Sequence, residues 1–238
     1  MEQFSMDLQV RYSECDGDRK VPLHQILNYF QDCTTLHSES LGYGIDNNIE
    51  HKRAWFLLSY DIRINRMPEL FEKIRIITEP YLMKGYFGYR RFFLQDDKGE
   101  VLVSGDSIWI LMDVEHMLPM KIPEDMTRAF VPEPSPAEKP MKRKIRPKSD
   151  WSLLEEFDIS DFYLDTNHHV NNNYYIMWMK SAVNHLELYR VRIDYRKAAL
   201  PGDHLLMYRQ DQDEKVYIKY ENDRGEVLAY VECFQKTE

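Results

Sequence analysis

The chain contains two related halves, and this duplication constrains its fold more than any other feature. Residues 16–21 (DGDRKV) resemble residues 165–170 (DTNHHV), and residues 97–102 (DKGEVL) parallel residues 223–228 (DRGEVL). The first pair precedes a helical pattern, and the second pair enters a strand through a turn with glycine where positive φ is needed. Chance resemblance at both ends of two such segments is improbable, so we infer an internal duplication.

The segment after each copy of the first motif has the periodicity of a helix with one apolar face. In the first half the stripe is formed by Leu23, Ile26, Leu27, Phe30, Cys33, Thr34 and His37. In the second half it is formed by Tyr175, Trp178, Met179, Ala182, Val183 and Leu186. Each helix should therefore bury one side against a sheet.

Several strands are expected in each half. Met6, Leu8, Val10 and Tyr12 alternate before the first helix. Further strands are expected at Trp55–Ile64, Lys73–Met83, Tyr86–Asp96, Val101–Met112, Leu188–Tyr195, His204–Arg209, Lys215–Tyr220 and Val227–Phe234. One helix followed by hairpin-connected strands predicts an α+β unit in which an antiparallel sheet wraps around the helix.

A proline-rich segment separates the halves. Residues 131–140 (VPEPSPAEKP) cannot continue a helix or a central strand, so they should form an extended, semi-stiff connector. The predicted organisation is an N-terminal domain at 1–130, a proline-rich and basic linker at 131–149, and a C-terminal domain at 150–238.

Composition narrows the functional class. The net charge of −9 argues against a general nucleic-acid binder. The sequence has no run of about 18 apolar residues, so we expect no membrane-spanning helix. The first residues resemble no secretory signal, and Cys15, Cys33 and Cys233 are too few and too far apart for a disulfide framework. We therefore expect a cytoplasmic protein. The histidines and cysteines have no metal-ligand spacing, so no metal is expected.

The main candidate for chemistry is the segment at 165–173. Asp165, Asn167 and His169 are two residues apart in a segment expected to be extended, so their side chains should point the same way. A helix follows directly, and its first N–H groups and dipole favour negative charge. These groups can polarise a carbonyl and direct water at it, if the chain curls with Asn171, Asn172 or Asn173 as the cap. The pattern is typical of a hydrolase of activated acyl groups.

The first half differs at this point. Lys20 replaces His169, and Asp18 replaces Asn167. A purely structural helix start, which is the alternative interpretation, gives no reason for this difference. We therefore expect one reactive centre in the second half, with the first half free to bind the acyl chain. His168 should point away from the site.

The chain carries the pattern Asp-x-Asn-x-His-Val-Asn-Asn at its second helix, and it repeats a helix-in-sheet unit. In both features it resembles the acyl-[acyl carrier protein] thioesterases, and among them a bacterial member. The resemblance covers residues 16–42, 55–123 and 165–203. It implies a tandem double hotdog fold and release of fatty acid from acyl carrier protein, which ends chain elongation in fatty acid biosynthesis. It also implies that the carrier's phosphopantetheine arm delivers the thioester to Asp165, Asn167 and His169, with no cofactor.

The resemblance extends to substrate contacts, with one departure. Asn171, Asn172, Trp55 and Tyr195 are the expected substrate-binding residues, although Trp55 could equally be core. In plant members a glutamate proposed to assist water follows the Tyr-Arg-Arg/Lys strand, but here that position is Ala198. The identity of the general base is therefore open, and neither Asp194 nor Asp203 is at the matching position.

The basic part of the linker has two interpretations. Lys142, Arg143, Lys144, Arg146 and Lys148 form either a solvated linker or a docking patch for an acidic carrier. Two other functions stay open: an acyl-coenzyme A thioesterase, and a non-catalytic acyl-binding module. Since the duplication already supplies a pair of units, a monomer and a homodimer are both compatible with the sequence.

Overall fold

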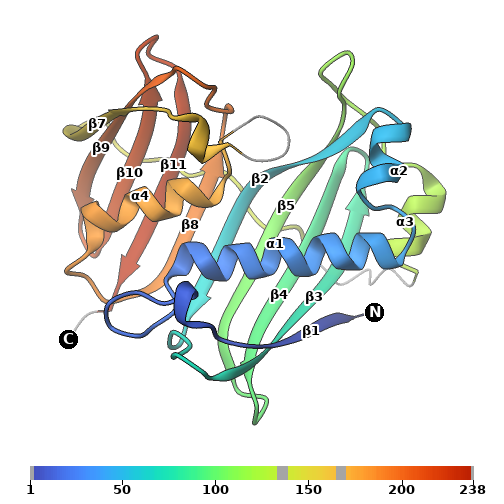
Figure 1. Cartoon of the computed structure of the whole chain (residues 1–238). Helices are drawn as coiled ribbons and strands as arrows, with labels where there is room; N and C mark the ends of the chain where they lie inside the picture. Colours follow the sequence, from blue (N-terminus) through green and yellow to red (C-terminus); the bar gives the residue numbers. More distant parts are fainter. Residues whose placement is uncertain (1–2, 133–138, 165–169, 237–238) are drawn as a thin grey trace. The chain divides into compact units, whose positions relative to one another are not determined.

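The chain folds into two compact units. A computed structural model describes residues 3–132, 139–164 and 170–236. Unit 1 comprises Met1–Leu58 and Ile64–Lys142, and unit 2 comprises Ser59–Arg63 and Arg143–Glu238. Each unit has one long helix against an antiparallel sheet (Figure 1), which confirms the predicted α+β class. The exact domain bounds stay a prediction.

Unit 1 is built on helix α1 (Leu23–Ser40). Its strands lie in the spatial order β1 (Phe4–Gln9), β3 (Lys73–Lys84), β4 (Phe87–Asp96), β5 (Val101–Asp113) and β2 (Arg53–Ile64). Shorter elements are η1 (Tyr12–Glu14), α2 (Ile45–Glu50), β6 (Leu118–Pro119) and α3 (Glu124–Phe130). Within the described parts of the chain, no helix is long and apolar enough to cross a membrane.

The buried face of α1 matches the predicted stripe. Six of the predicted positions are buried: Leu23, Ile26, Leu27, Phe30, Cys33 and His37. The Phe30 ring stacks on Phe92 of β4 with 4.6 Å between ring centroids. Burial of this face provides most of the stability of the helix, because tertiary packing of an amphipathic face contributes more than intrinsic helix propensity.

Unit 2 repeats the arrangement around α4 (Asn173–Val183). Its strands lie in the order β8 (Leu188–Tyr195), β11 (Val227–Gln235), β10 (Lys215–Asn222), β9 (His204–Gln212) and β7 (Ser152–Asp158). Residues Ser59–Arg63 of β2 pair with β8 within this unit. The short helix η2 (Asp161–Tyr163) precedes the predicted site.

Backbone hydrogen bonds repeat the duplication. The Val21 N–H donates to the Pro68 carbonyl at 2.9 Å, and the Val170 N–H donates to the Ala199 carbonyl at 3.4 Å. Each acceptor lies just beyond the end of β2 or β8. The hairpin glycines Gly99 and Gly225 have φ of 83° and 74°, as predicted for positive-φ turns. Both units thus use the same connections around their helices.

Three details of the sequence prediction were wrong. Tyr12 is not part of the first strand, since it lies in η1 and is 81% exposed. Helix α4 ends at Val183, so Leu186 lies beyond it. Strand β7 was not predicted, because its residues are almost all exposed and show no apolar alternation.

A buried polar cluster lies beneath α1 in unit 1. His37 is 2% exposed, and Arg90 of β4 donates through Nη1 to His37 Nδ1 at 3.0 Å and to Thr78 Oγ1 at 2.9 Å. Because a guanidinium only donates, His37 Nδ1 must be the acceptor. Burial, aided by the Arg90 charge, lowers the His37 pKa to about 4. His37 is therefore neutral near neutral pH.

This cluster predicts a pH dependence of stability. Between the folded pKa of about 4 and the unfolded pKa near 6.5, the unfolded chain binds the extra proton, so stability falls as the pH falls through this range. The stability difference between wild type and His37→Gln should shrink by roughly 3 kcal/mol from pH 7 to pH 4 in urea unfolding experiments.

The exposed His116 offers a control of opposite sign. The hydrogen bond with Asp113 raises the His116 pKa, so the contribution of His116 to the free energy of unfolding is lost as the pH rises. A difference between wild type and His37→Gln that stays constant from pH 7 to pH 4 would contradict the assignment.

Candidate functional site

The predicted catalytic residues Asp165, Asn167 and His169 lie outside the described residues. The structure does describe both flanks of this segment. Leu164 and Val170 pair with each other as an isolated antiparallel bridge. The segment thus leaves and rejoins unit 2 at one place.

The upstream flank is the short helix η2. The Ser160 hydroxyl caps it by accepting a hydrogen bond from the Phe162 N–H at 3.2 Å. The Tyr163 carbonyl then accepts a hydrogen bond from the Asn171 N–H at 2.9 Å. This bond spans the whole predicted catalytic segment and holds its two ends together.

The downstream flank is the start of α4. Asn172 directly precedes the helix with its backbone already in the right-handed helical region, and its side chain makes no capping bond. The Asn171 Oδ1 accepts from the Asn173 N–H at 3.0 Å, and the Asn171 carbonyl accepts from the Tyr174 N–H at 3.0 Å. Of the three asparagines predicted as caps, Asn171 is thus the one whose side chain acts.

These bonds affect the expected oxyanion stabilisation. The first N–H groups of α4 were expected to help hold a developing oxyanion. The Asn173 and Tyr174 N–H groups already donate to Asn171. These two N–H groups are therefore not free to hold an oxyanion.

Strand β8 holds the same region from the other side. The Tyr195 hydroxyl donates to the Asn172 carbonyl at 2.9 Å. Tyr195 is 6% exposed, and burial raises the pKa of its hydroxyl well above the ordinary value, so it stays a donor. Its observed contact is with the backbone at the start of α4. Substrate binding by Tyr195, Asn171 or Asn172 stays a prediction.

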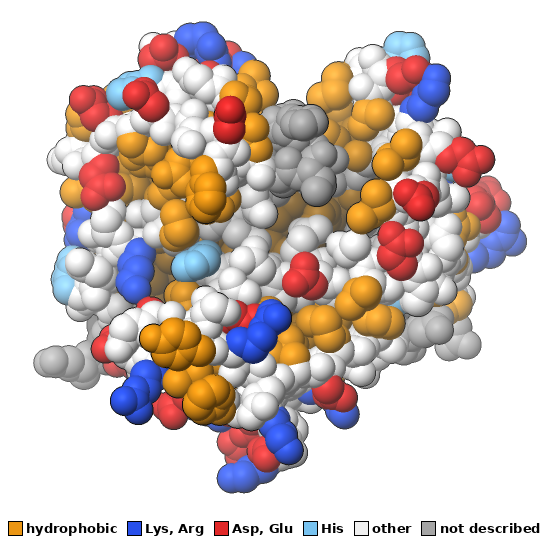
Figure 2. Space-filling model, in the orientation of Figure 1, with side chains coloured by type: hydrophobic (Ala, Val, Ile, Leu, Met, Phe, Trp, Pro, Cys, Tyr) orange, Lys and Arg blue, Asp and Glu red, His pale blue; other side chains and the backbone are white. Residues whose placement is uncertain are grey.

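An aromatic cluster surrounds this helix start. The Tyr163 ring lies 5.0 Å from Tyr174 and 5.4 Å from Trp178 between centroids, and Phe157 lies 4.9 Å from Trp178. Figure 2 shows hydrophobic side chains gathered over α4. Because the rings meet edge to face, they fix the orientation of η2 relative to α4. Sequence analysis missed this role of Tyr163, although the dense aromatics at 162–178 were a visible signal.

The equivalent segment of unit 1 is fully described. There Asp16 Oδ1 accepts hydrogen bonds from the N–H groups of Asp18 at 3.0 Å and Lys20 at 3.2 Å. An aspartate at this position can thus close the turn by itself. A test of Asp165 must separate this structural task from chemistry.

The carboxylates near Ala198 have structural partners. Asp194 is fully buried, and its oxygens pair with Arg143 Nε at 2.7 Å and Arg196 Nη2 at 2.6 Å. Asp203 pairs with Arg224 at 2.7 Å and accepts from the Leu200 N–H at 3.0 Å. Neither is offered to a substrate, so neither replaces the glutamate missing at Ala198.

The cysteines are poor nucleophiles. Burial raises the pKa of Cys33 and of Cys233 to about 12, and burial also raises the pKa of Cys15. A thiolate is the reactive form, and it is scarce at such pKa values. Among the residues that the structure describes, no group of three His, Cys, Asp or Glu side chains could hold a metal ion.

Trp55 belongs to unit 1. It packs on an apolar cluster at the end of the sheet, and its ring covers Gly88, where a Cβ would lie 3.2 Å away. The buried members of the cluster are Leu111, Ile122, Met126, Phe130 and Val131. Gly88 therefore permits the close approach of the indole, and the role of Trp55 toward an acyl chain stays a prediction.

The predicted docking residues differ in environment. Lys142, Lys144 and Arg146 are exposed. Arg143 is half-buried, donates through Nε to Asp194, and bonds the Tyr195 carbonyl through Nη2. Its observed partners are internal, on the strand that also carries the Tyr195 hydroxyl.

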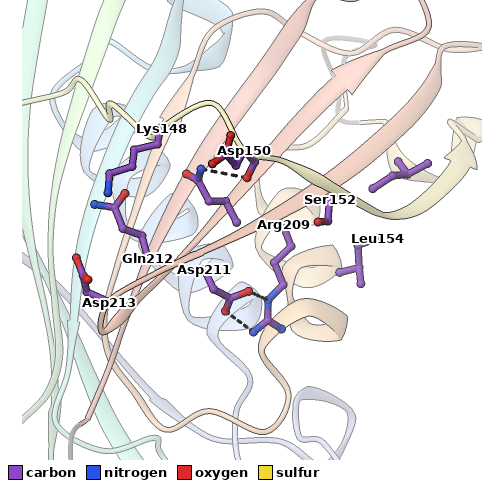
Figure 3. A pocket seen from close by; sticks show the side chains of 10 residues that line it. Lys148, Asp150, Ser152, Leu154, Arg209, Asp211, Gln212 and Asp213 are labelled. Carbon is purple, nitrogen blue, oxygen red and sulfur yellow. Dashed lines mark hydrogen bonds and ion pairs between the residues drawn. The ribbon is translucent and has the colours of Figure 1, made fainter.

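A depression lies at the edge formed by β7 and β9. It has a volume of about 420 Å³ and is lined by Lys148, Asp150, Arg209 and Asp211 among others (Figure 3). Arg209 forms two hydrogen bonds with Asp211 and one with the Ala182 carbonyl at the end of α4. The charges of Arg209 and Asp211 thus neutralise each other, and the hydrogen bond to Ala182 joins β9 to α4.

Comparison with known proteins identifies relatives for both halves. The family model of the acyl-ACP thioesterase N-terminal domain matches residues 1–130, and that of the C-terminal domain matches residues 148–233. A chloroplastic acyl-[acyl-carrier-protein] hydrolase of Cuphea viscosissima is 26% identical over 207 residues, which are 79% of this chain and 49% of that protein. A chloroplastic palmitoyl-acyl carrier protein thioesterase of Arabidopsis thaliana is 25% identical over 213 residues, which are 82% and 52% of the two chains. The chain spans about half the length of these curated relatives.

Two solved structures share the fold. An acyl-ACP thioesterase from Bacteroides thetaiotaomicron superposes with a TM-score of 0.86 and 19% identity, over 98% of each chain. The 12:0-ACP thioesterase from Umbellularia californica superposes with a TM-score of 0.82 and 18% identity, over 99% of this chain and 98% of that one. These likenesses confirm the tandem double hotdog fold that the family resemblance implied.

The hydrogen bond from Tyr195 to Asn172 predicts an effect on catalysis. Tyr195→Phe removes only the hydroxyl, so the fold should persist while the start of α4 loses one anchor. Loss of about 1 kcal/mol of positioning should lower kcat about fivefold and leave KM nearly unchanged in a thioester hydrolysis assay.

Tyr189 provides the matched control. It also lies on β8 but is 43% exposed, so Tyr189→Phe should keep the wild-type kcat. Equal kcat values for the two variants would argue against a positioning role for Tyr195.

Proposed function

The chain belongs to the acyl-ACP thioesterase family, and from that membership we propose that it hydrolyses the thioester of fatty acyl-[acyl carrier protein] to free fatty acid. The observation that carries the proposal is the match of both family domains in order, with the Asp165–His169 segment inside the second. The relatives named above as acyl-carrier hydrolases support the same reaction.

The proposed reaction is direct attack by water. Water adds to the thioester carbonyl, the C–S bond breaks, and the thiolate of the carrier's pantetheine arm takes up a proton. Asp165 and His169 hold and deprotonate the water, and His169 can then protonate the leaving sulfur because the ordinary histidine pKa is near 6.5. The Asn167 amide donates to the carbonyl oxygen.

The described flanks support this assignment. The bond from Asn171 to Tyr163 and the bridge between Leu164 and Val170 fix both ends of a five-residue segment, Asp165 to His169. Both described flanks of the assigned residues are therefore held together by backbone contacts. The weak nucleophilicity of the three cysteines supports water attack over an acyl-cysteine intermediate.

Unit 1 has the proposed role of binding the acyl chain. Its segment equivalent to the site is closed by Asp16 and carries Lys20 where unit 2 has His169. Trp55, which packs on the buried apolar cluster of this unit, is the residue proposed to contact the hydrocarbon chain. A reducing compartment such as the cytoplasm suits the three free cysteines.

Substitutions at Asp165 and His169 test the assignment. Asp165→Asn keeps an oxygen that can close the turn as Asp16 does, but it removes the carboxylate. Asp165→Asn and His169→Ala should each lower kcat on acyl-[acyl carrier protein] by at least about 100-fold, because general acid–base groups contribute that much. Release of the carrier thiol is the measurement.

His168→Ala is the matched control, since His168 is expected to point away from the site. It should keep the wild-type rate. Wild-type rates for both Asp165→Asn and His169→Ala would eliminate the assignment of these residues. Acyl-coenzyme A with the same acyl chain, assayed in parallel, distinguishes the two carriers.

A further inference from the structure

The last part of the linker lies on unit 2 with alternating side chains. We call residues 143–150 the strap. Arg143, Ile145 and Pro147 are buried or half-buried, whereas Lys144, Arg146 and Lys148 between them are exposed. This period of two is that of an extended segment with one face on the protein. The three exposed cations therefore point outward in a row.

The strap is anchored along its length. Arg143 pairs with the fully buried Asp194 at 2.7 Å, and Ile145 is 3% exposed. At the far end, Gln210 Nε2 donates to the Asp150 carbonyl at 3.1 Å (Figure 3). The outward cations thus start from a fixed backbone, and less conformational entropy is lost when a partner binds.

The outward cations are available for a partner. Within the described residues, none of Lys144, Arg146 and Lys148 forms a salt bridge inside the protein. Side chains two residues apart in an extended segment are about 6.6 Å apart, and carboxylates four residues apart on a helix are about 6 Å apart along its axis. The row therefore matches the spacing of one acidic face of a helix.

A depression beside the strap adds an apolar contact. It has a volume of about 500 Å³ and is lined by Arg146, Lys148, Trp151, Arg196 and Tyr230 among others. The Trp151 and Tyr230 rings stack at 6.1 Å, and the Arg196 guanidinium lies 5.8 Å from the Tyr230 centroid. Such an aromatic floor beside cations suits an apolar side chain flanked by carboxylates.

We propose that the strap and this depression form the surface that receives an acidic helix of the acyl carrier protein. The inference rests on the proposed function, and it assigns docking to Lys144, Arg146 and Lys148 while giving Arg143 an internal anchoring role. A long polyanion such as nucleic acid suits the surface less well. The cation row ends at the exposed Asp150, and the whole chain has a net charge of −9.

The test compares two triple charge reversals. The first is Lys144→Glu, Arg146→Glu and Lys148→Glu, and the matched control is Lys84→Glu, Lys98→Glu and Lys121→Glu, which changes the net charge equally at exposed lysines of unit 1. Each protein is assayed on an acyl-[acyl carrier protein] and on the neutral N-acetylcysteamine thioester of the same acyl chain.

The strap variant should raise KM for the carrier substrate at least about tenfold at low salt and flatten the salt dependence of kcat/KM. It should hydrolyse the N-acetylcysteamine thioester like wild type, and the control should resemble wild type on both substrates. Unchanged KM in the strap variant, or an equal rise in the control, would overturn the docking surface.

A direct binding measurement separates this inference from the proposed function. Fluorescence anisotropy of labelled acyl carrier protein should show binding to wild type and at least about tenfold weaker binding to the strap variant. If wild type hydrolyses neither thioester, the proposed function fails, and binding still decides the docking surface. Equally tight binding of a single-stranded oligonucleotide would mark a general polyanion site and overturn the proposal.

Discussion

The closure of the segment between Leu164 and Val170 is the constraint on which the rest of the site depends. The Asn171 N–H bonds to Tyr163, the Val170 N–H bonds to Ala199, and the Tyr195 hydroxyl bonds to the Asn172 carbonyl. These contacts join η2, α4 and the end of β8. The described flanks of the proposed catalytic segment are therefore held together at one place in unit 2.

The duplication explains why such a site could arise in one unit only. Both units donate from a valine N–H to a carbonyl beyond the neighbouring strand, at Pro68 and at Ala199. In unit 1 the equivalent turn is closed by Asp16 and leads into a helix capped by Pro22. In unit 2 three asparagines occupy the start of the helix. The shared backbone thus carries different side chains in the two copies, which is the basis of the proposed division between acyl binding and catalysis.

Much of the fold could be predicted from the sequence, because α1 and most strands bury one face and so have a clear period. Strand β7 was missed because it is exposed on both faces, and the end of α4 was misplaced because Leu186 continues the apolar spacing beyond Asn184. The site was predicted only in part. The motif indicated Asp165, Asn167 and His169, but backbone acceptors such as the Tyr163 and Ala199 carbonyls have no sequence signature. Tyr195 and Arg143 resembled residues that face a substrate and a carrier, yet their observed bonds are to Asn172 and Asp194, since the pairing of distant polar groups depends on tertiary structure.

Direct attack by water is the central claim, and a search for a covalent acyl-protein during a single turnover tests it most directly. In a single turnover of acyl-[acyl carrier protein], acid-quenched at successive times and analysed by mass spectrometry, the account predicts that free fatty acid appears while the protein stays unmodified at every time point. An acyl group found covalently attached to the chain before product appears would contradict it.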